Sequence, residues 1–232
     1  MAHQTPGSAL ELVRNTTKTA APQSVLQIGA GCYENSKALI DALGSLEEPQ
    51  FTLVVGDKDQ SVLDLLNSDG LDEWADIVPQ PADQVLPDFY FQEDRFDLAI
   101  INSGYTYDET LVCFYYMNKM LSKGNKIIVN QAANDKMHAL CRHILDTGDF
   151  VVSAASESPK QASKLESLVR EQYKKLPAWI HRQAEMVINP ALLENASTLG
   201  LDGDVIVFEK ITEVEEKLED EVDVDAMIEA MI

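Results

Sequence analysis

The stretch RFDLAIINSGYTYDE, residues 95–109, indicates how this chain folds. Its apolar run at residues 98–101 is followed at once by Asn102, Ser103 and Gly104. A short apolar run is typical of a buried strand in a parallel sheet, and open α/β sheets bind ligands just beyond the carboxyl ends of such strands. The stretch therefore predicts a strand that ends at a binding edge, with the amide of Asn102 at its tip.

Similar apolar runs alternate with helical patterns along the chain, which is typical of βαβ units and a mostly parallel sheet. The strands are expected at residues 24–29, 51–56, 96–101, 124–131, 149–156 and 203–212, with a further short strand within residues 76–90. The helices are expected at residues 5–20, around 38–43, at 61–75 with a stop near 67–70, at 108–122, at 133–148 and at 159–187. The stretch 76–90 is expected to continue after its short strand with a loop and a helical turn. A length of 232 residues is enough for one sizeable core.

The chain carries 39 acidic against 18 basic residues, a net charge of −21. This excess argues against nucleic-acid and anionic-membrane partners, because both are polyanions. The three cysteines are odd in number and widely spaced, which favours a reducing compartment, and we expect a cytoplasmic protein. No stretch is long and apolar enough to span a bilayer, and the first residues show no signal peptide.

The composition of the chain changes in its last segment. Residues 212–232 are dense in acids and then end in the apolar residues Met227, Ile228, Met231 and Ile232. We expect one domain at residues 1–211 and a solvated acidic tail at 212–232; the alternative is a docking helix with anchors three or four residues apart. Residues 159–187 are the candidate for a lid or for pairing in a homodimer.

The expected strand ends carry a set of glycines, acids, amides and tyrosines. Glycines allow a sharp turn and a close approach to a ligand, and an acid after the second strand can accept both hydroxyls of a ribose. In strand order these residues are Gln27, Gly29, Ala30, Gly31 and Cys32; Asp57 and Asp59; Pro81, Ala82 and Asp83; Asn102, Ser103, Tyr105 and Tyr107; Asn130 and Gln131.

In this order, the stretches resemble the motifs of class I S-adenosylmethionine-dependent methyltransferases, most of all the small-molecule O-methyltransferase branch. The resemblance covers roughly residues 5–155 and rests on SVLQIGAGCYENSKALIDAL, FTLVVGDKDQSVLDLL, QPADQVLPDF, FDLAIINSGYTYDE and MLSKGNKIIVNQ. It implies a Rossmann-like, doubly wound α/β fold with a mostly parallel seven-stranded sheet, helices on both faces and an antiparallel last strand. It also implies S-adenosylmethionine as cofactor, held by Gln27, Gly29, Ala30, Gly31, Asp57, Asp59, Pro81, Ala82, Asn102 and Ser103.

The departures from the family pattern concern mainly acids that have become amides. Gln27 stands where the family has Glu, Asn102 where it has Asp, and Asn130-Gln131 where it has Asp-Asn; Tyr105 replaces a His. In the metal-dependent branch, the strand-four Asp and the Asp-Asn pair hold a divalent cation. A neutral amide replaces a carboxylate poorly in such a site, so we expect no catalytic metal.

Two functions are compatible with these residues. The first is metal-independent methyl transfer to a small-molecule acceptor, with Asn102, Tyr105 and Tyr107 as the catalytic candidates and Asp108 as a further candidate base. The second is a binding or scaffold protein that has lost the chemistry, with Tyr33 filling the cofactor loop. A wide glycine loop admits methionine and ribose, whereas a filled loop does not. A weaker third candidate is another nucleoside-dependent enzyme on a Rossmann-like sheet.

Overall fold

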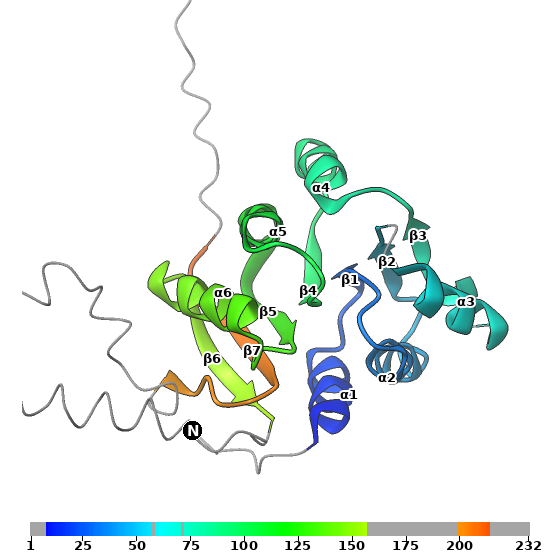
Figure 1. Ribbon diagram of the computed structural model, residues 1–232, viewed down its shortest axis with the longest axis horizontal. Helices are drawn as coiled ribbons and strands as arrows, with labels where there is room; N and C mark the ends of the chain where they lie inside the picture. Colours follow the sequence, from blue (N-terminus) through cyan, green and yellow to red (C-terminus); the bar gives the residue numbers. More distant parts are fainter. Residues whose placement is uncertain (1–7, 57–58, 71, 157–198, 214–232) are drawn as a thin grey trace, which may run out of the picture.

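The computed structural model describes residues 8–56, 59–70, 72–156 and 199–213, and these contain one mixed sheet (Figure 1). The sheet has seven strands in the order β3-β2-β1-β4-β5-β7-β6. The strands are β1 (Ser24–Ile28), β2 (Gln50–Val54), β3 (Asp76–Val78), β4 (Phe96–Ile101), β5 (Leu121–Asn130), β6 (Phe150–Ala155) and β7 (Val205–Lys210).

The parallel strands end together. Ile28 of β1 is in register with Val54 of β2 and with Ile101 of β4, and Ile101 is in register with Val129 of β5. Strand β7 runs antiparallel to both β5 and β6. The predicted Rossmann-like sheet with an antiparallel last strand is therefore confirmed, and the carboxyl ends of β1, β2, β4 and β5 form one edge.

Helices cover both faces of the sheet (Figure 1). One layer contains α1 (Ala9–Ala20), α2 (Tyr33–Leu43) and α3 (Gln60–Ser68), and the other contains α4 (Ala82–Phe91), α5 (Tyr107–Met120) and α6 (Asp135–Asp146). A short 3₁₀ turn (Asp72–Trp74) precedes β3. Among the described residues, no helix is both long and apolar enough to cross a membrane.

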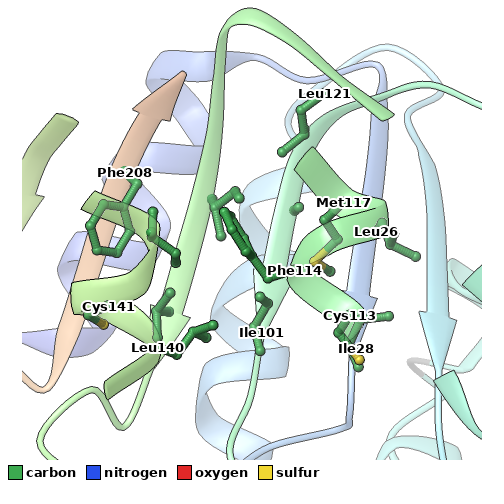
Figure 2. Packing of buried hydrophobic residues seen from close by; sticks show 14 of the residues in the cluster. Leu26, Ile28, Ile101, Cys113, Phe114, Met117, Leu121, Leu140, Cys141 and Phe208 are labelled. Carbon is green, nitrogen blue, oxygen red and sulfur yellow. The ribbon is translucent and has the colours of Figure 1, made fainter. Parts of the chain in front are cut away.

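The two layers divide the core between them because successive strand residues point to opposite faces. Leu26 and Ile28 of β1 lie beside Met117 and Cys113 of α5, as Figure 2 shows, whereas Val25 faces α1 and α2. All these apolar side chains are buried, so the strands are apolar on both faces, as a parallel sheet between helices requires.

The segment after β3 forms more helix than predicted. The sequence suggested a single helical turn, but α4 spans ten residues with Pro87 inside it. Its buried residues Ala82, Val85 and Leu86 recur at helical spacing and pack on the core, and this burial holds the helix together across the proline. Strand β5 also begins earlier than predicted, at Leu121. The predicted helix at 159–187 and most of the predicted tail lie outside the described residues.

Candidate functional site

A cavity of about 290 Å³ opens beyond the carboxyl ends of β2, β3 and β4. Its walls come from Val55, Gly56 and Asp59 after β2, residues 79–83 after β3, and residues 103–105 after β4; Glu109 and Cys113 of α5 close one side. These elements are far apart in sequence and meet only because the parallel strands end together. The cavity therefore lies at the edge that the sequence predicts to bind a ligand.

Three carboxylates stand on the cavity wall: Asp59, Asp83 and Glu109. Asp83 lies in the first turn of α4 and is exposed. Glu109 also accepts a hydrogen bond from the backbone N–H of Thr106, 2.6 Å away, and so belongs to the capping box of α5. A wall of this charge favours a cationic ligand or one that donates hydrogen bonds, and disfavours an anion.

Asp59 joins two strand ends. One carboxylate oxygen accepts from the N–H of Ala30, at 3.1 Å, and the other accepts from the N–H of Gly56, at 2.9 Å. Asp59 thereby fastens the glycine loop after β1 to the loop after β2. The other predicted ribose-binding acid, Asp57, lies outside the described residues.

Gln27 supports the glycine loop from inside. Its side chain is buried and donates to the carbonyl oxygens of Gly29 (3.0 Å) and Ala30 (3.3 Å) and to the hydroxyl of Ser36 (3.1 Å). The loop turns sharply here, with positive φ at Gly29 and Gly31, a conformation that favours glycine. The hydrogen bonds of Gln27 thus hold the glycine loop in this conformation.

Asn102 fills the inside of the glycine loop. Its side-chain nitrogen donates to the carbonyl oxygen of Gly29, at 2.6 Å, and lies 3.4 Å from that of Ile28. Its side-chain oxygen accepts from the amide of Asn130, at 2.7 Å. A Cβ placed on Gly31 would lie only 2.5 Å from this oxygen, so Asn102 is packed directly against the loop.

Tyr105 lies against the other end of the loop and lines the cavity. Its ring comes within 3.1 Å of the place a Cβ would take on Gly29. Its hydroxyl is buried and has no hydrogen-bond partner among the described residues. Burial, and next the charge of Asp59, raise the pKa of Tyr105 well above its usual value. The hydroxyl is therefore protonated at neutral pH and acts as a donor rather than as a base.

The structure divides the predicted site residues into two sets. Asp59, Pro81, Ala82, Ser103 and Tyr105 line the cavity. The remaining predicted residues within the described part of the chain do not line the cavity. Tyr107 begins α5. The others form or support the glycine loop beside the cavity: Gln27, Gly29, Ala30, Gly31 and Asn102.

The hypothesis that Tyr33 fills the glycine loop is wrong. Tyr33 is the first residue of α2, and its hydroxyl is hydrogen-bonded to Asp69 and to Lys37, which lies 3.2 Å away. Residues 33 and 37 share a helix face, so this contact directs the ring toward Asp69, which follows α3. The side chains that do fill the loop are those of Asn102 and Tyr105.

The residues at the positions of the family's metal ligands are hydrogen-bonded within the protein. Asn130 donates to Asn102, and Gln131 accepts from the hydroxyl of Ser103. In the described part of the chain, no group of three or more His, Cys, Asp or Glu residues could hold a metal ion.

Sequence reasoning missed Glu109 and Cys113 as cavity residues. The signal for Glu109 was present: Thr106 and Glu109 have the spacing of a capping box, which marks the helix start directly after the strand-four loop. Cys113 follows one helical turn later on the same face. The spacing alone places both residues near the binding edge.

No protein-family model and no curated protein matches this sequence. Solved structures do match. The O-methyltransferase TomG from Streptomyces achromogenes, crystallised with S-adenosylmethionine, is 15% identical over 63% of this chain and 73% of its own, with a TM-score of 0.51. The O-methyltransferase from Bacillus cereus, in complex with S-adenosylhomocysteine, is 13% identical over 67% and 78%, with a TM-score of 0.52.

A methyltransferase from Geobacter sulfurreducens is 14% identical over 88% of this chain and 78% of its own, with a TM-score of 0.51. At these identities the likeness concerns the fold. The chain therefore has the fold of class I S-adenosylmethionine-dependent methyltransferases. Two of these neighbours, TomG and the Bacillus cereus protein, are O-methyltransferases.

Proposed function

We propose that the protein binds S-adenosylmethionine at the carboxyl edge of its sheet and transfers the methyl group to a small-molecule acceptor without a metal ion. The observation that carries this proposal is the cavity between the ends of β2, β3 and β4. The presence of S-adenosylmethionine or S-adenosylhomocysteine in structural neighbours supports the choice of cofactor.

The cavity wall fits the adenosyl part of such a ligand. Pro81 and Ala82 offer apolar surface to a flat base, while Asp59 and Asp83 offer acceptors to hydroxyl or amino groups. The negative wall also suits a sulfonium cation. The glycine loop, in contrast, is filled by Asn102 and Tyr105, so the present side-chain arrangement fits the adenosyl part and not the amino-acid tail.

The cofactor supplies a methyl group already activated on a positively charged sulfur, so the protein has to position an acceptor and take up its proton. Tyr105, protonated and without a partner among the described residues, can donate a hydrogen bond to the acceptor. Glu109 is a carboxylate on the same wall and is suited to receive the proton. Tyr107 does not line the cavity, so its predicted catalytic role has less support than that of Tyr105.

The hydrogen bonds of the side-chain amides at the family's metal-ligand positions support metal independence. Asn102 and Asn130 bond to each other, and Gln131 bonds to Ser103. Magnesium and calcium sites depend on carboxylate charge, which these side chains do not provide. Their hydrogen-bonding capacity is used between strands β4 and β5 instead.

A second candidate is a binding protein for adenosyl ligands that performs no methyl transfer. The filled glycine loop favours it, because the carbonyl of Gly29 already accepts from both Gln27 and Asn102. Both candidates use the same cavity, and they differ in whether turnover follows binding.

We also propose partners and a location for the protein. The net charge of −21 supports the absence of nucleic-acid and anionic-membrane partners, and a cytoplasmic location is likewise proposed from composition. We propose a homodimer that pairs through residues 159–187. Sedimentation that shows only monomer at high protein concentration would reject the pairing.

Calorimetric titration with S-adenosylmethionine and S-adenosylhomocysteine tests the proposed function. Asp83→Ala removes a cavity carboxylate, and Asp88→Ala, an exposed residue of the same helix away from the cavity, is the matched control. We expect binding in the micromolar range that Asp83→Ala weakens severalfold and Asp88→Ala leaves unchanged. No binding of either ligand to the folded protein rejects the methyltransferase and favours a binding or scaffold protein without the chemistry. Binding without S-adenosylhomocysteine release over a panel of small hydroxyl and amine acceptors selects the second.

A further inference from the structure

We infer that Asn102 sets the ligand preference of the cavity: its side chain closes the glycine loop, so the protein favours adenosyl nucleosides without an amino-acid tail over S-adenosylmethionine. The inference rests on the proposed function, since it concerns the same cavity. Asn102 is then a specificity-determining residue, and its side chain must move before a nucleoside with an amino-acid tail, such as S-adenosylmethionine, can bind.

The glycine loop is packed against Asn102 and already uses two of its carbonyls and one of its N–H groups within the protein. Asn102 lies within 2.5 Å of the place a Cβ would take on Gly31. The carbonyl of Gly29 accepts from two side chains, and the carbonyl of Ala30 accepts from Gln27 and from Ser36, 2.7 Å away. The N–H of Ala30 donates to Asp59. The carbonyls of Gly29 and Ala30 and the N–H of Ala30, which a charged amino-acid tail could otherwise use, are thus occupied by the protein.

This closure requires an amide at position 102. The atom that faces the loop lies 2.6 Å from one carbonyl oxygen and 3.4 Å from another, so it must be a donor. A carboxylate has only acceptors when ionised and would be repelled by both carbonyls. Asn130 adds a second requirement, because its N–H needs the oxygen of Asn102 as acceptor.

A nucleoside without a tail does not need the loop to open. The cavity lies beside the loop, and its wall residues include neither Gly29, Gly31 nor Asn102. Such a ligand meets the carboxylates and the apolar wall and leaves the Asn102–Gly29 hydrogen bond in place. S-adenosylmethionine must break that bond and displace Asn102, which reduces its net affinity.

The test compares adenosine with S-adenosylmethionine by calorimetry on the full chain. Asn102→Asp keeps the shape and removes the donor, and Asn102→Ala removes the side chain. Asn67→Asp, at an exposed position of α3, is the control for the added charge. In the wild type we expect adenosine to bind at least as tightly as S-adenosylmethionine. In both Asn102 variants we expect a gain for S-adenosylmethionine of about tenfold, equal to about 1.4 kcal/mol, with adenosine affinity unchanged.

Unchanged adenosine affinity also shows that a variant has kept its fold, and if one variant does not fold the other decides. The inference is overturned if either folded variant loses affinity for S-adenosylmethionine or shows no gain. When both variants fold, a gain in Asn102→Asp alone also overturns the inference, since that result reflects attraction between charges. If adenosine and S-adenosylmethionine bind to neither wild type nor variants, the proposed function fails as well.

Discussion

The side-chain nitrogen of Asn130 donates to the side-chain oxygen of Asn102 across 2.7 Å and links the end of β5 to the end of β4. Both side chains are buried. In the metal-dependent family branch that the sequence resembles, acids at these positions bind a cation together. In this protein two neutral amides bind each other, and the link between the strands needs no ion.

This link leads to a prediction about divalent cations. The melting temperature of the wild type should be the same with magnesium and with a chelator. The double variant Asn102→Asp, Asn130→Asp places two carboxylates where the amides meet; it should melt lower in chelator because like charges repel, and recover when magnesium is added. Scanning calorimetry measures both. A magnesium-dependent rise for the wild type would contradict metal independence.

Asp59 should be important for stability as well as binding. Asp59→Ala removes two hydrogen bonds from backbone N–H groups to a carboxylate and leaves those of Ala30 and Gly56 without their acceptor. We expect a loss of about 2 kcal/mol in the free energy of unfolding, measured by urea denaturation. Asp64→Ala, a substitution in α3 away from the cavity, serves as control. Equal stability of the two variants would show that the glycine loop does not depend on Asp59.

Tyr105→Phe should stabilise the protein. It removes a buried hydroxyl that has no partner among the described residues, and the expected gain in the free energy of unfolding is about 1 kcal/mol. This gain should grow above about pH 10. The pKa of Tyr105 is higher in the folded protein than in the unfolded chain, so the tyrosine ionises first in the unfolded state. The wild type therefore loses stability as pH rises, whereas the Phe variant does not. Denaturation series at several pH values compare the two proteins. A less stable Tyr105→Phe at neutral pH would mean that the hydroxyl is bonded.

The cysteines should differ in reactivity. Burial raises the pKa of Cys113 to about 12 and raises that of Cys141 well above its ordinary value, so neither forms a thiolate at neutral pH. Cys32 is partly exposed. We expect the folded protein to titrate one thiol with a disulfide reagent and the denatured protein to titrate three. Rapid modification of Cys113 in the folded state, located by peptide mapping, would show that the cavity opens to that depth.

The presence of the strands along the chain and the position of the binding edge could be predicted from the sequence, because apolar runs of strand length mark buried parallel strands regardless of side-chain detail. The stretch at 96–101 became β4 with the predicted bounds, and Ser103 and Tyr105 reached the cavity. The antiparallel β7 followed from family resemblance, since no local pattern distinguishes it from a parallel strand.

The side-chain contacts within the site could not be predicted, because they join pairs of residues that are far apart in the sequence. Nothing near Tyr33 indicates that Asp69 will accept from its hydroxyl. Nor does the sequence around Asn102 indicate whether its amide faces solvent, a ligand or the carbonyl of Gly29. The length of α4 was missed for a related reason: Pro87 disfavours a helix locally, and burial of Val85 and Leu86 outweighs it.

Glu109 holds the first turn of α5 and is at the same time part of the cavity wall. Folding and ligand choice therefore depend on one side chain. A substitution that removes the acceptor at this position also loosens the start of the helix, and one that preserves the helix keeps a carboxylate or an amide in the cavity. Substrate preference at this wall is thus constrained in evolution by the stability of α5, and changes are easier at Asp83, which carries no such second role in the structure described here.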